Sequence, residues 1–349
     1  MMKYLGALAM AALVGLAPAA AQTPMKQTPL KKVTIGGTLS ATDIGLWVAH
    51  KKGYFRDEGI DAEFITFDSA ARMIAAIGTG ELDVSAGGHS AGLFNAVARG
   101  IDIRIVSDKS QNVVGRSSIK MLVRKELVDS GRYRTFADLK GLKVAEAAPG
   151  GSAFPIVIKF LEKAGLTYND IQPVYMSFPQ MSIALQSGAI DVALPAEPSV
   201  TQALRMGGVV AVANDYDVYP IHQVSEIMYS GKFAKGDIDV ARRFMKAFLR
   251  GVRYHNDSLG PNGEFTGAQG DEVVAIAVEY GPFKDPAVWR SFILSYCNPD
   301  GTLHVESLKE DLDLFKKQKY IEGQVEIEQV IDTRFVDWAV RELGPWKKK

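Results

Sequence analysis

Short apolar runs alternate along the first two thirds of the chain with longer segments in which apolar residues recur every three or four positions. Residues 32–36 form one such run, and residues 43–52 form a periodic segment with packing positions at Leu46, Trp47 and Ala49. The short runs predict strands and the periodic segments predict helices. This strand–helix rhythm is typical of an α/β protein with a mixed, mostly parallel sheet and helices on both faces.

One part of this pattern occurs twice. Residues 73–105 match residues 181–213 at a constant offset of 108 positions without a gap, so that Asp83 corresponds to Asp191. A period this long in only two copies is not that of a solenoid, whose repeats are short and numerous. The duplication therefore predicts two similar α/β lobes.

Two loops occupy corresponding places in the two copies. Residues 87–90 follow the strand of the first copy, and residues 195–198 follow the strand of the second, with His89 and Glu197 at the same repeat position. Ligands of open α/β sheets bind beyond the carboxyl ends of the strands. We therefore expect these loops to form two walls of one cleft.

The chain is expected to cross between the lobes twice, which gives a hinge of two segments. We assign residues 32–121 and 220–349 to lobe I and residues 122–219 to lobe II. From residue 237 onwards the periodicity is helical, and these helices are expected to pack on lobe I. The predicted helices span residues 240–254, 271–278, 286–296, 306–318 and 328–343.

The N-terminus has the features of a cleavable signal peptide over residues 1–21. Lys3 precedes an apolar stretch at residues 5–16, and small residues lead to a cleavage site after Ala21. The apolar stretch is too short to span a membrane. Residues 22–31 are expected to form a flexible leader, and the mature protein is expected to be periplasmic.

The composition gives no indication of a nucleic-acid partner or of an acidic membrane surface as a partner. The 40 basic residues balance 40 acidic residues, and the pI is about 7.0, which gives no case for binding nucleic acid. Cys297 is the single cysteine and cannot form an internal disulfide. We expect a monomer whose large core folds without disulfides, metal or cofactor.

Two strand-to-helix loops suggest an anion site. Ser40, Thr42 and Asp43 precede one predicted helix, and Gly151 and Ser152 precede another. Helix N-termini present unpaired N–H groups and partial positive charge, which suit carboxylate, sulfonate or phosphate. Plain helix capping is the alternative for both loops.

Five further side chains could complete such a site. His89 could donate to an anionic ligand and Glu197 could accept from a ligand amine or ring nitrogen, although each could equally have a structural partner. Arg116 could clamp an oxyanion, while Tyr219 and His222 lie on the returning crossover, near the expected base of the cleft.

Catalytic and metal-binding motifs are absent from the sequence. Asp83 and Asp191 each follow a turn before a strand, so we expect them to fix that turn rather than to act as acid and base. The five histidines show no His-x-x-x-His spacing, and there is no Cys-x-x-Cys, Gly-x-Ser-x-Gly, P-loop or dinucleotide motif. The chain is therefore not expected to be an enzyme.

Four segments resemble the substrate-binding proteins of ABC transporters in the nitrate/sulfonate/taurine, NMT1/THI5-like group. They are residues 45–60 (GLWVAHKKGYFRDEGI), 75–83 (AAIGTGELD), 138–145 (DLKGLKVA) and 188–193 (GAIDVA) followed by Glu197-Pro198. The resemblance extends over about residues 33–212. Many members have an aromatic residue before the Glu-Pro pair, whereas this chain has Ala196, which puts a stacking contact there in doubt.

The resemblance implies a type II periplasmic-binding-protein fold that closes on its ligand and presents it to a membrane permease. It does not specify the ligand, but the helix starts described above favour a small organic anion, such as a carboxylate, a sulfonate, or a pyrimidine or aromatic acid. The resemblance also implies ligand contacts in four loops, which contain Ser40, Thr42, Asp43, Gly88, His89, Ser90, Gly151, Ser152, Ala153 and Glu197.

Two alternatives remain open at this point. Pyrimidine-precursor synthases resemble this group, but they contain a cysteine-rich iron-binding stretch that this chain lacks. A protein that presents its ligand to a membrane sensor would have the same sequence features as a transport protein. Neighbouring genes for a permease or for a sensor kinase would distinguish the transport role from the sensing role.

Overall fold

The computed structural model describes residues 29–348. The predicted signal peptide and most of the predicted leader lie outside this range. The leader was predicted to reach residue 31, but strand β1 (Lys31–Gly37) already begins there, because its backbone pairs with β2 (Ile60–Thr66) from Lys31 onwards. None of the helices within residues 29–348 combines the length and the apolar character that a membrane crossing requires.

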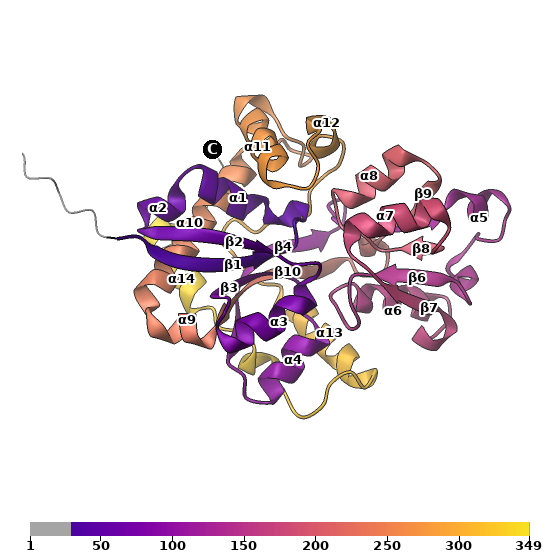
Figure 1. Cartoon of the computed structure of the whole chain (residues 1–349), viewed down its shortest axis with the longest axis horizontal. Coiled ribbons are helices and arrows are strands. Elements are labelled where there is room, and N and C mark those ends of the chain that lie inside the picture. The colour runs from indigo at the N-terminus through magenta and orange to yellow at the C-terminus, as the bar shows by residue number, and fades with distance from the viewer. Residues whose placement is uncertain (1–28, 349) are drawn as a thin grey trace, which may run out of the picture.

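Two five-stranded sheets form two lobes that lie side by side (Figure 1). The sheet of lobe I has the order β2-β1-β3-β10-β4, and that of lobe II has the order β7-β6-β8-β5-β9. In each sheet the fourth strand in this order, β10 or β5, runs antiparallel to both neighbours, and the other strands are parallel. The remaining strands are β3 (Val84–Gly87), β4 (Ile103–Val113), β5 (Lys120–Arg124), β6 (Lys143–Glu146), β7 (Gln172–Tyr175), β8 (Val192–Ala193), β9 (Val209–Asn214) and β10 (Ile221–Ser230).

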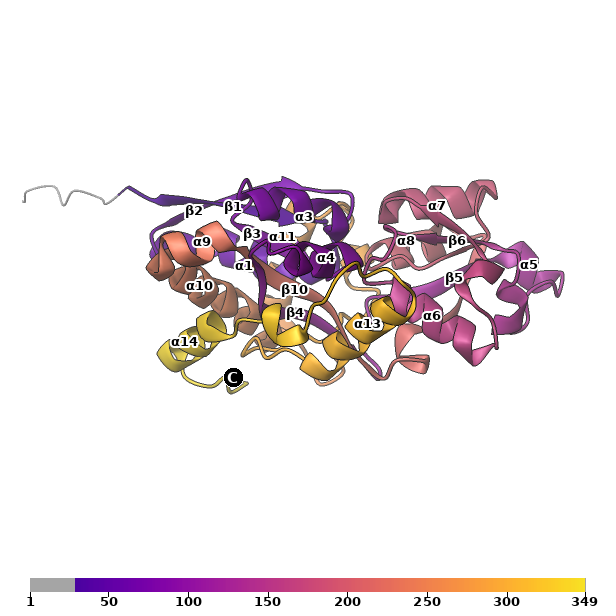
Figure 2. The same ribbon diagram turned by 90° about the horizontal axis from the view of Figure 1, so that it is seen from below.

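Helices cover both faces of each sheet, as the sequence predicts (Figures 1 and 2). The helices of lobe II are α5 (Lys125–Asp129), α6 (Phe154–Lys163), α7 (Phe178–Ser187) and α8 (Ser199–Met206). The helices of lobe I are α1 (Ile44–Lys51), α2 (Tyr54–Asp57), α3 (Ala70–Thr79), α4 (Ala91–Ala98), α9 (Gly231–Gly236), α10 (Ile238–Asp257), α11 (Gly267–Tyr280), α12 (Pro286–Trp289), α13 (Val305–Lys317) and α14 (Arg334–Leu343).

The duplicated segment forms the same elements in both lobes. Helix α3 and helix α7 have equal lengths at the offset of 108 positions, and they end at Gly80 and Gly188, whose φ angles are 75° and 74°. Glycine adopts this left-handed conformation without a steric penalty. Asp83 and Asp191 each accept a hydrogen bond from the backbone N–H of the adjacent strand, at Thr34 and Lys143. The two aspartates thus hold neighbouring strands together, which agrees with a structural role.

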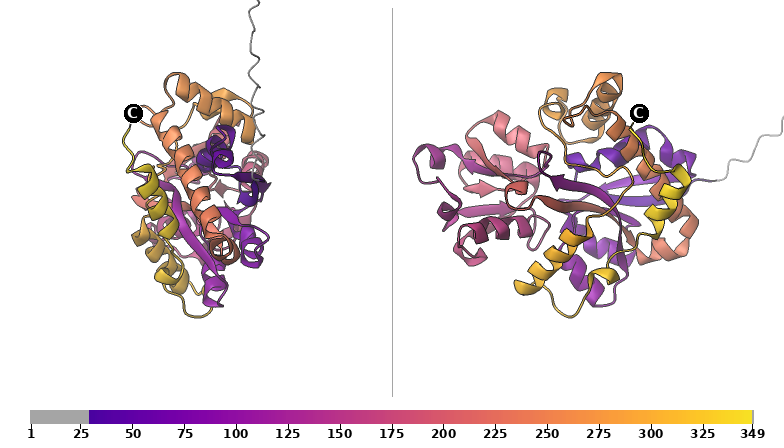
Figure 3. Two further views of the ribbon diagram at one scale, coloured as in Figure 1. Left: turned by 90° about the vertical axis from the view of Figure 1, so that its left-hand side faces the viewer. Right: turned by 180° about the vertical axis from the view of Figure 1, so that it is seen from behind.

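The lobes are connected by two short segments that lie next to each other, visible in the right-hand view of Figure 3. The first lies at residues 114–119 and the second at residues 215–220, and the strands β4 and β10 that they extend pair at Val113 and Ile221. The predicted boundary between residues 121 and 122 therefore falls inside β5. All of β5 belongs to lobe II, because it pairs there with β8 and β9.

The C-terminal block packs mainly on lobe I, with α10 against α1 and α14. The helix predicted at residues 286–296 ends at Trp289, since the chain must then extend to pair Tyr296 with Gln111 of β4. Helix α13 also reaches lobe II. The Phe315 ring stacks on Phe154 of α6, with ring centroids 5.6 Å apart.

Candidate functional site

A cavity of about 60 Å³ lies where the two lobes meet. Its walls come from the starts of α1, α3, α6 and α7, from the loops after β3, β6 and β8, from the first inter-lobe connection and from β10. The lining residues are Thr38, Ser40, Thr42, Ser69, Ala70, Ala71, Gly87, Gly88, His89, Ser118, Ile119, Ala147, Ala148, Gly151, Ser152, Ala153, Phe178, Ala196, Val224 and Ser225.

The start of α1 is held rigidly on the lobe I side of the cavity. Ser40 Oγ lies 2.6 Å from Thr42 Oγ1, and Asp43 Oδ2 accepts from the Ser40 backbone N–H at 3.1 Å. The other oxygen of Asp43 forms a buried ion pair with Lys109, at 2.5 Å from Nζ. Asp43 therefore anchors the loop from behind, while Ser40 and Thr42 border the cavity. Asp43, predicted as a ligand contact, does not line the cavity, and both its oxygens have protein partners.

Ser69 is a lining residue whose buried hydroxyl group has no hydrogen-bond partner in the protein. It is 3% exposed and precedes α3, yet its Oγ makes no hydrogen bond to protein. Buried hydroxyls are normally paired, since an unpaired one costs free energy. The adjacent Ala70 and Ala71 begin α3, where backbone N–H groups have no acceptor within the helix. A bound anion would satisfy both the hydroxyl and these N–H groups.

The lobe II wall combines a glycine-rich turn with an apolar face. Gly151, Ser152 and Ala153 precede α6 as predicted, and Phe178 begins α7. Gly88 of lobe I lies close to Ser152 across the cavity, because a Cβ built on Gly88 would lie 2.4 Å from Ser152 Oγ and 2.6 Å from the Val224 carbonyl oxygen.

Backbone hydrogen bonds join the lobes directly at two places. The Ala41 N–H donates to the Glu197 carbonyl oxygen, and the Ala91 N–H donates to the Gly150 carbonyl oxygen, both at 2.9 Å. The loops at residues 87–90 and 195–198 thus border one cavity, as the duplication predicts. The lobes are in contact around the site, so a bound ligand would be enclosed.

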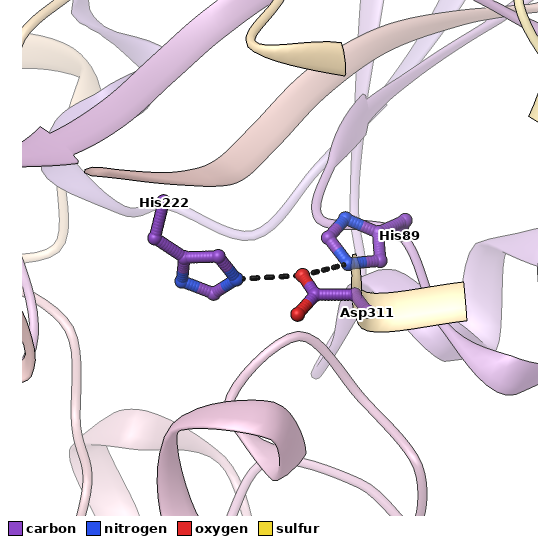
Figure 4. A group of neighbouring side chains, drawn as sticks. All are labelled: His89, His222 and Asp311. Atoms are coloured by element: carbon purple, nitrogen blue, oxygen red, sulfur yellow. Dashed lines mark hydrogen bonds and ion pairs between the residues drawn. The ribbon is translucent and has the colours of Figure 1, made fainter. Parts of the chain in front are cut away.

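The His89 ring does not serve the cavity, although residue 89 borders it. Its Nδ1 lies 3.0 Å from Glu226 Oε1 and its Nε2 lies 2.9 Å from Asp311 Oδ2, and the ring is fully buried (Figure 4). Burial lowers the pKa of His89, but the charges and hydrogen bonds of Glu226 and Asp311 outweigh it and raise the pKa to about 10. The predicted donation to a ligand is therefore not available from this ring.

Glu197 is also occupied within its own lobe. Its Oε2 accepts from the Thr201 backbone N–H at 3.0 Å and its Oε1 from the Thr201 hydroxyl at 3.2 Å, so it caps the first turn of α8. Burial raises the pKa of Glu197 to about 7. The neighbouring Ala196 lines the cavity in place of the Glu197 side chain.

The other predicted side chains lie outside the cavity lining. Arg116 donates to the Leu294 and Ser295 carbonyl oxygens and lies over the Tyr296 ring. These contacts fix the first connection to the C-terminal block.

Tyr219 and His222 belong to the second connection and the start of β10. Their rings stack 4.3 Å apart, with Tyr219 donating to the Ser307 carbonyl oxygen and His222 Nε2 lying 2.7 Å from Asp311 Oδ2. Ser90 is likewise structural, because its Oγ accepts from the Leu93 N–H and caps α4. None of these three side chains faces the cavity.

Sequence reasoning missed several lining residues. Ser69 immediately precedes α3 and Phe178 is the first residue of α7, so each lies at the start of one copy of the repeated helix, which was a usable signal. Ser118 comes from the first connection, and Val224 and Ser225 come from β10. Tertiary packing sets the course of both segments past the cavity and leaves no local signal.

The lining is uncharged apart from the His89 ring, whose nitrogens are both engaged. Seven of the lining residues have hydroxyl groups, namely Thr38, Ser40, Thr42, Ser69, Ser118, Ser152 and Ser225. Hydroxyl donors and helix N-termini without a neutralising cation suit a small anion held by dipoles.

Known proteins with similar sequences include solute-binding proteins. The model of the family described as NMT1/THI5 like matches residues 41–258, more than half of the chain. The chain is 24% identical over 321 residues to the "Putative aliphatic sulfonates-binding protein" of Bacillus subtilis (strain 168), with 90% of this chain and 89% of that protein covered. The protein of the same name from Escherichia coli (strain K12) is 28% identical over 155 residues, which span 44% of this chain and 46% of that protein.

Solved structures show the same fold at lower identity. The periplasmic nitrate-binding protein NrtA from Synechocystis PCC 6803 has a TM-score of 0.75 at 13% identity, with 90% of this chain and 89% of that chain covered. The desulfurization enzyme DSZB has a TM-score of 0.62 at 14% identity, with 90% of this chain and 99% of that chain covered. These likenesses confirm the two-lobed periplasmic-binding-protein fold.

Proposed function

The chain belongs to the NMT1/THI5-like family, and from that premise we propose that it is the solute-binding component of an ABC importer. It would work in the periplasm, close its lobes on a small organic anion and deliver the anion to a membrane permease. The relatives named as sulfonate-binding proteins support a sulfonate or a chemically similar carboxylate as the ligand.

The observation that carries this proposal is the unpaired Ser69 hydroxyl beside the start of α3. A tetrahedral sulfonate or a planar carboxylate at this place would accept from the Ser69 hydroxyl, from the first N–H groups of α3 and from the Ser40 and Thr42 hydroxyls. The apolar remainder of the ligand would face Phe178 and the alanines on the lobe II side.

The lining also favours binding without chemistry. It contains no cysteine, no carboxylate and no histidine with a free nitrogen. The seven lining hydroxyls could act as nucleophiles only with an adjacent general base, and no such base lines the cavity. The enzyme DSZB shares the fold, but at 14% identity it shows the fold alone.

The proposal is tested by isothermal titration calorimetry with nitrate, ethanesulfonate, taurine, benzoate and a pyrimidine carboxylate. We expect one of these classes to bind with a Kd of roughly micromolar or better, because hydrogen bonds to an anion are stronger in a closed cavity that excludes water. Gly88→Ala should weaken binding by about 10- to 100-fold, since the added Cβ meets the Val224 carbonyl oxygen and Ser152.

Gly236→Ala is the matched control, because a Cβ there meets nothing within 4 Å. It should leave the affinity unchanged. The proposal fails if no compound in the panel binds, or if Gly88→Ala binds as tightly as Gly236→Ala.

Once a ligand is known, a second experiment distinguishes delivery to a permease from presentation to a sensor. A transport protein loaded with its ligand should stimulate the ATPase of a co-encoded transporter, whereas a sensor partner should not.

A further inference from the structure

Three potential metal ligands converge in lobe I, behind the wall of the cavity. His89 comes from the loop after β3, His222 from β10 and Asp311 from α13, so the three lie more than 80 positions apart in the sequence. Figure 4 shows both rings pointing at the same carboxylate. One ligand atom from each residue lies within 4.8 Å of the other two. No sequence motif marks this group, because its members come from three distant segments of the chain.

The geometry of the group suits a divalent transition-metal ion. Both imidazole Nε2 atoms already face Asp311 Oδ2, at 2.9 Å and 2.7 Å. Zinc and related ions are bound by imidazole nitrogens and carboxylate oxygens at about 2.0–2.2 Å. Ligand atoms around one ion therefore lie roughly 3–3.5 Å apart, a spacing that small side-chain shifts would reach here.

The surroundings of His89 match those of a metal-bound histidine. Glu226 accepts from His89 Nδ1 at 3.0 Å, which orients the ring and leaves Nε2 for an ion. A carboxylate behind the histidine is the usual partner in metal sites, where it fixes the tautomer and raises the basicity of the ligand.

Unpaired atoms provide a second, independent observation. Asp311 Oδ1, Glu226 Oε2 and His222 Nδ1 are buried and make no hydrogen bond to protein. The side chains of His89, His222, Glu226 and Asp311 are all 0% exposed. Asp311 could therefore offer both oxygens to an ion. An ion bound at Nε2 of His89 displaces the proton from that nitrogen. Two carboxylates with two neutral imidazoles then carry a charge of −2, which one divalent cation neutralises, and a neutral cluster is the least costly to bury.

We propose that His89, His222 and Asp311 bind one Zn²⁺-like ion that holds the cleft wall to helix α13. The loop of His89 includes Gly87 and Gly88, which line the ligand cavity. The ion would thus be structural, and it would be separate from the anion site. This site does not depend on the proposed transport function, because its ligands lie in lobe I alone.

The test uses the full chain, purified through a tag without histidines and refolded from urea with Zn²⁺ or Co²⁺. We expect about one ion per chain by elemental analysis, and a visible Co²⁺ band of the kind given by a low-coordinate N/O site. A chelator present during refolding should lower the Tm by about 5 °C or more, because bound ion stabilises only the folded state.

Asp311→Asn and His222→Gln should abolish ion uptake. His255→Gln is the matched control, because His255 is an equally buried histidine without a carboxylate partner. The proposal is overturned if the wild-type chain refolds with no bound Zn²⁺ or Co²⁺, or if Asp311→Asn retains as much ion as His255→Gln. In that case the group is a hydrogen-bonded charge cluster alone. Since the anion titration is separate, its failure would leave the outcome of this test unaffected.

Discussion

The two copies of the duplicated segment have kept the same backbone and acquired different chemistry. Ser69 precedes α3 with an unpaired hydroxyl, whereas Ser177, its counterpart, begins α7 in a capping box with Gln180. The second residue of the helix is Ala71 in lobe I and Pro179 in lobe II. Proline has no N–H group, so lobe I keeps a free donor where lobe II has lost one.

The two lobes therefore present different groups to a bound ligand. The lobe I copy presents hydroxyl and N–H donors, and the lobe II copy presents an apolar surface through Phe178 and Pro179. A duplicated fold thus supplies two similar walls, and a few substitutions at helix starts decide which wall holds the charged end of a ligand. The predictions below test this division, beginning with the largest expected effect.

Lys109→Met would remove the partner of Asp43, which anchors the α1 start in lobe I. Both side chains are almost fully buried, so the remaining carboxylate is left without compensation. We expect the free energy of unfolding to fall by about 3–5 kcal/mol in urea denaturation. Lys125→Met removes an exposed ion pair of lobe II and should cost only about 0.3–0.5 kcal/mol. Equal losses would show that the buried pair does not anchor lobe I.

Glu197→Gln tests the pH response of the lobe II copy. The folded pKa of Glu197 is raised to about 7 from the ordinary 4.5, so the folded state binds this proton more tightly than the unfolded state. Its contribution to stability is present below pH 4.5 and declines as the pH rises to 7, by roughly 3 kcal/mol.

The variant should lack this decline, and urea denaturation at pH 4.5 and 7 measures it. Exposed Glu81→Gln serves as the control and should follow the wild-type slope. A wild-type slope in the Glu197→Gln variant would contradict the assignment of the decline to this carboxyl group.

Ala71→Pro would give α3 the residue that α7 already has. Proline fits the first turn of a helix, so stability should change little, while one N–H donor to the anion is lost. We expect about 10- to 100-fold weaker binding by calorimetry, because hydrogen bonds to charged groups contribute about 1.5–3 kcal/mol. Pro179→Ala, the reverse exchange in lobe II, should leave the affinity within about twofold. Comparable losses from the two exchanges would refute the division between lobes.

Ser69→Ala and Ser177→Ala compare the same repeat position in both lobes. Ser69→Ala should weaken anion binding by roughly fivefold and leave the ligand-free Tm unchanged, because its hydroxyl has no protein partner. Ser177→Ala should instead lower stability by about 0.5–1 kcal/mol through loss of the cap, with little effect on affinity. Exchanged phenotypes would mean that lobe II holds the anion.

The sequence predicted the lobes better than the side chains of the site. The 108-residue repeat, the helix starts at Ser40 and Gly151 and the shared cleft were all readable, because periodicity and helix capping are local signals. His89 and Glu197 were placed at the correct loops, but their side chains turn to Asp311 and Thr201.

Tertiary packing decides these orientations. Asp311 lies on α13, which is 222 positions from His89, and no local pattern indicates that α13 returns to the cleft wall. The boundary inside β5 was misplaced for the same reason, since the pairing partners of an apolar run cannot be read from the run itself.

The position of helix α13 has a consequence for ligand dissociation. Its buried face packs in lobe I through Leu308 and Leu312, while Phe315 stacks on Phe154, and Glu310 and Lys317 form exposed ion pairs with α6. We infer that α13 stabilises the closed arrangement from outside the cavity, because its contacts with α6 would have to break if the lobes separated. Because salt screens exposed pairs, the dissociation rate of a bound anion should increase with ionic strength even though no Asp, Glu, Lys or Arg side chain lines the cavity.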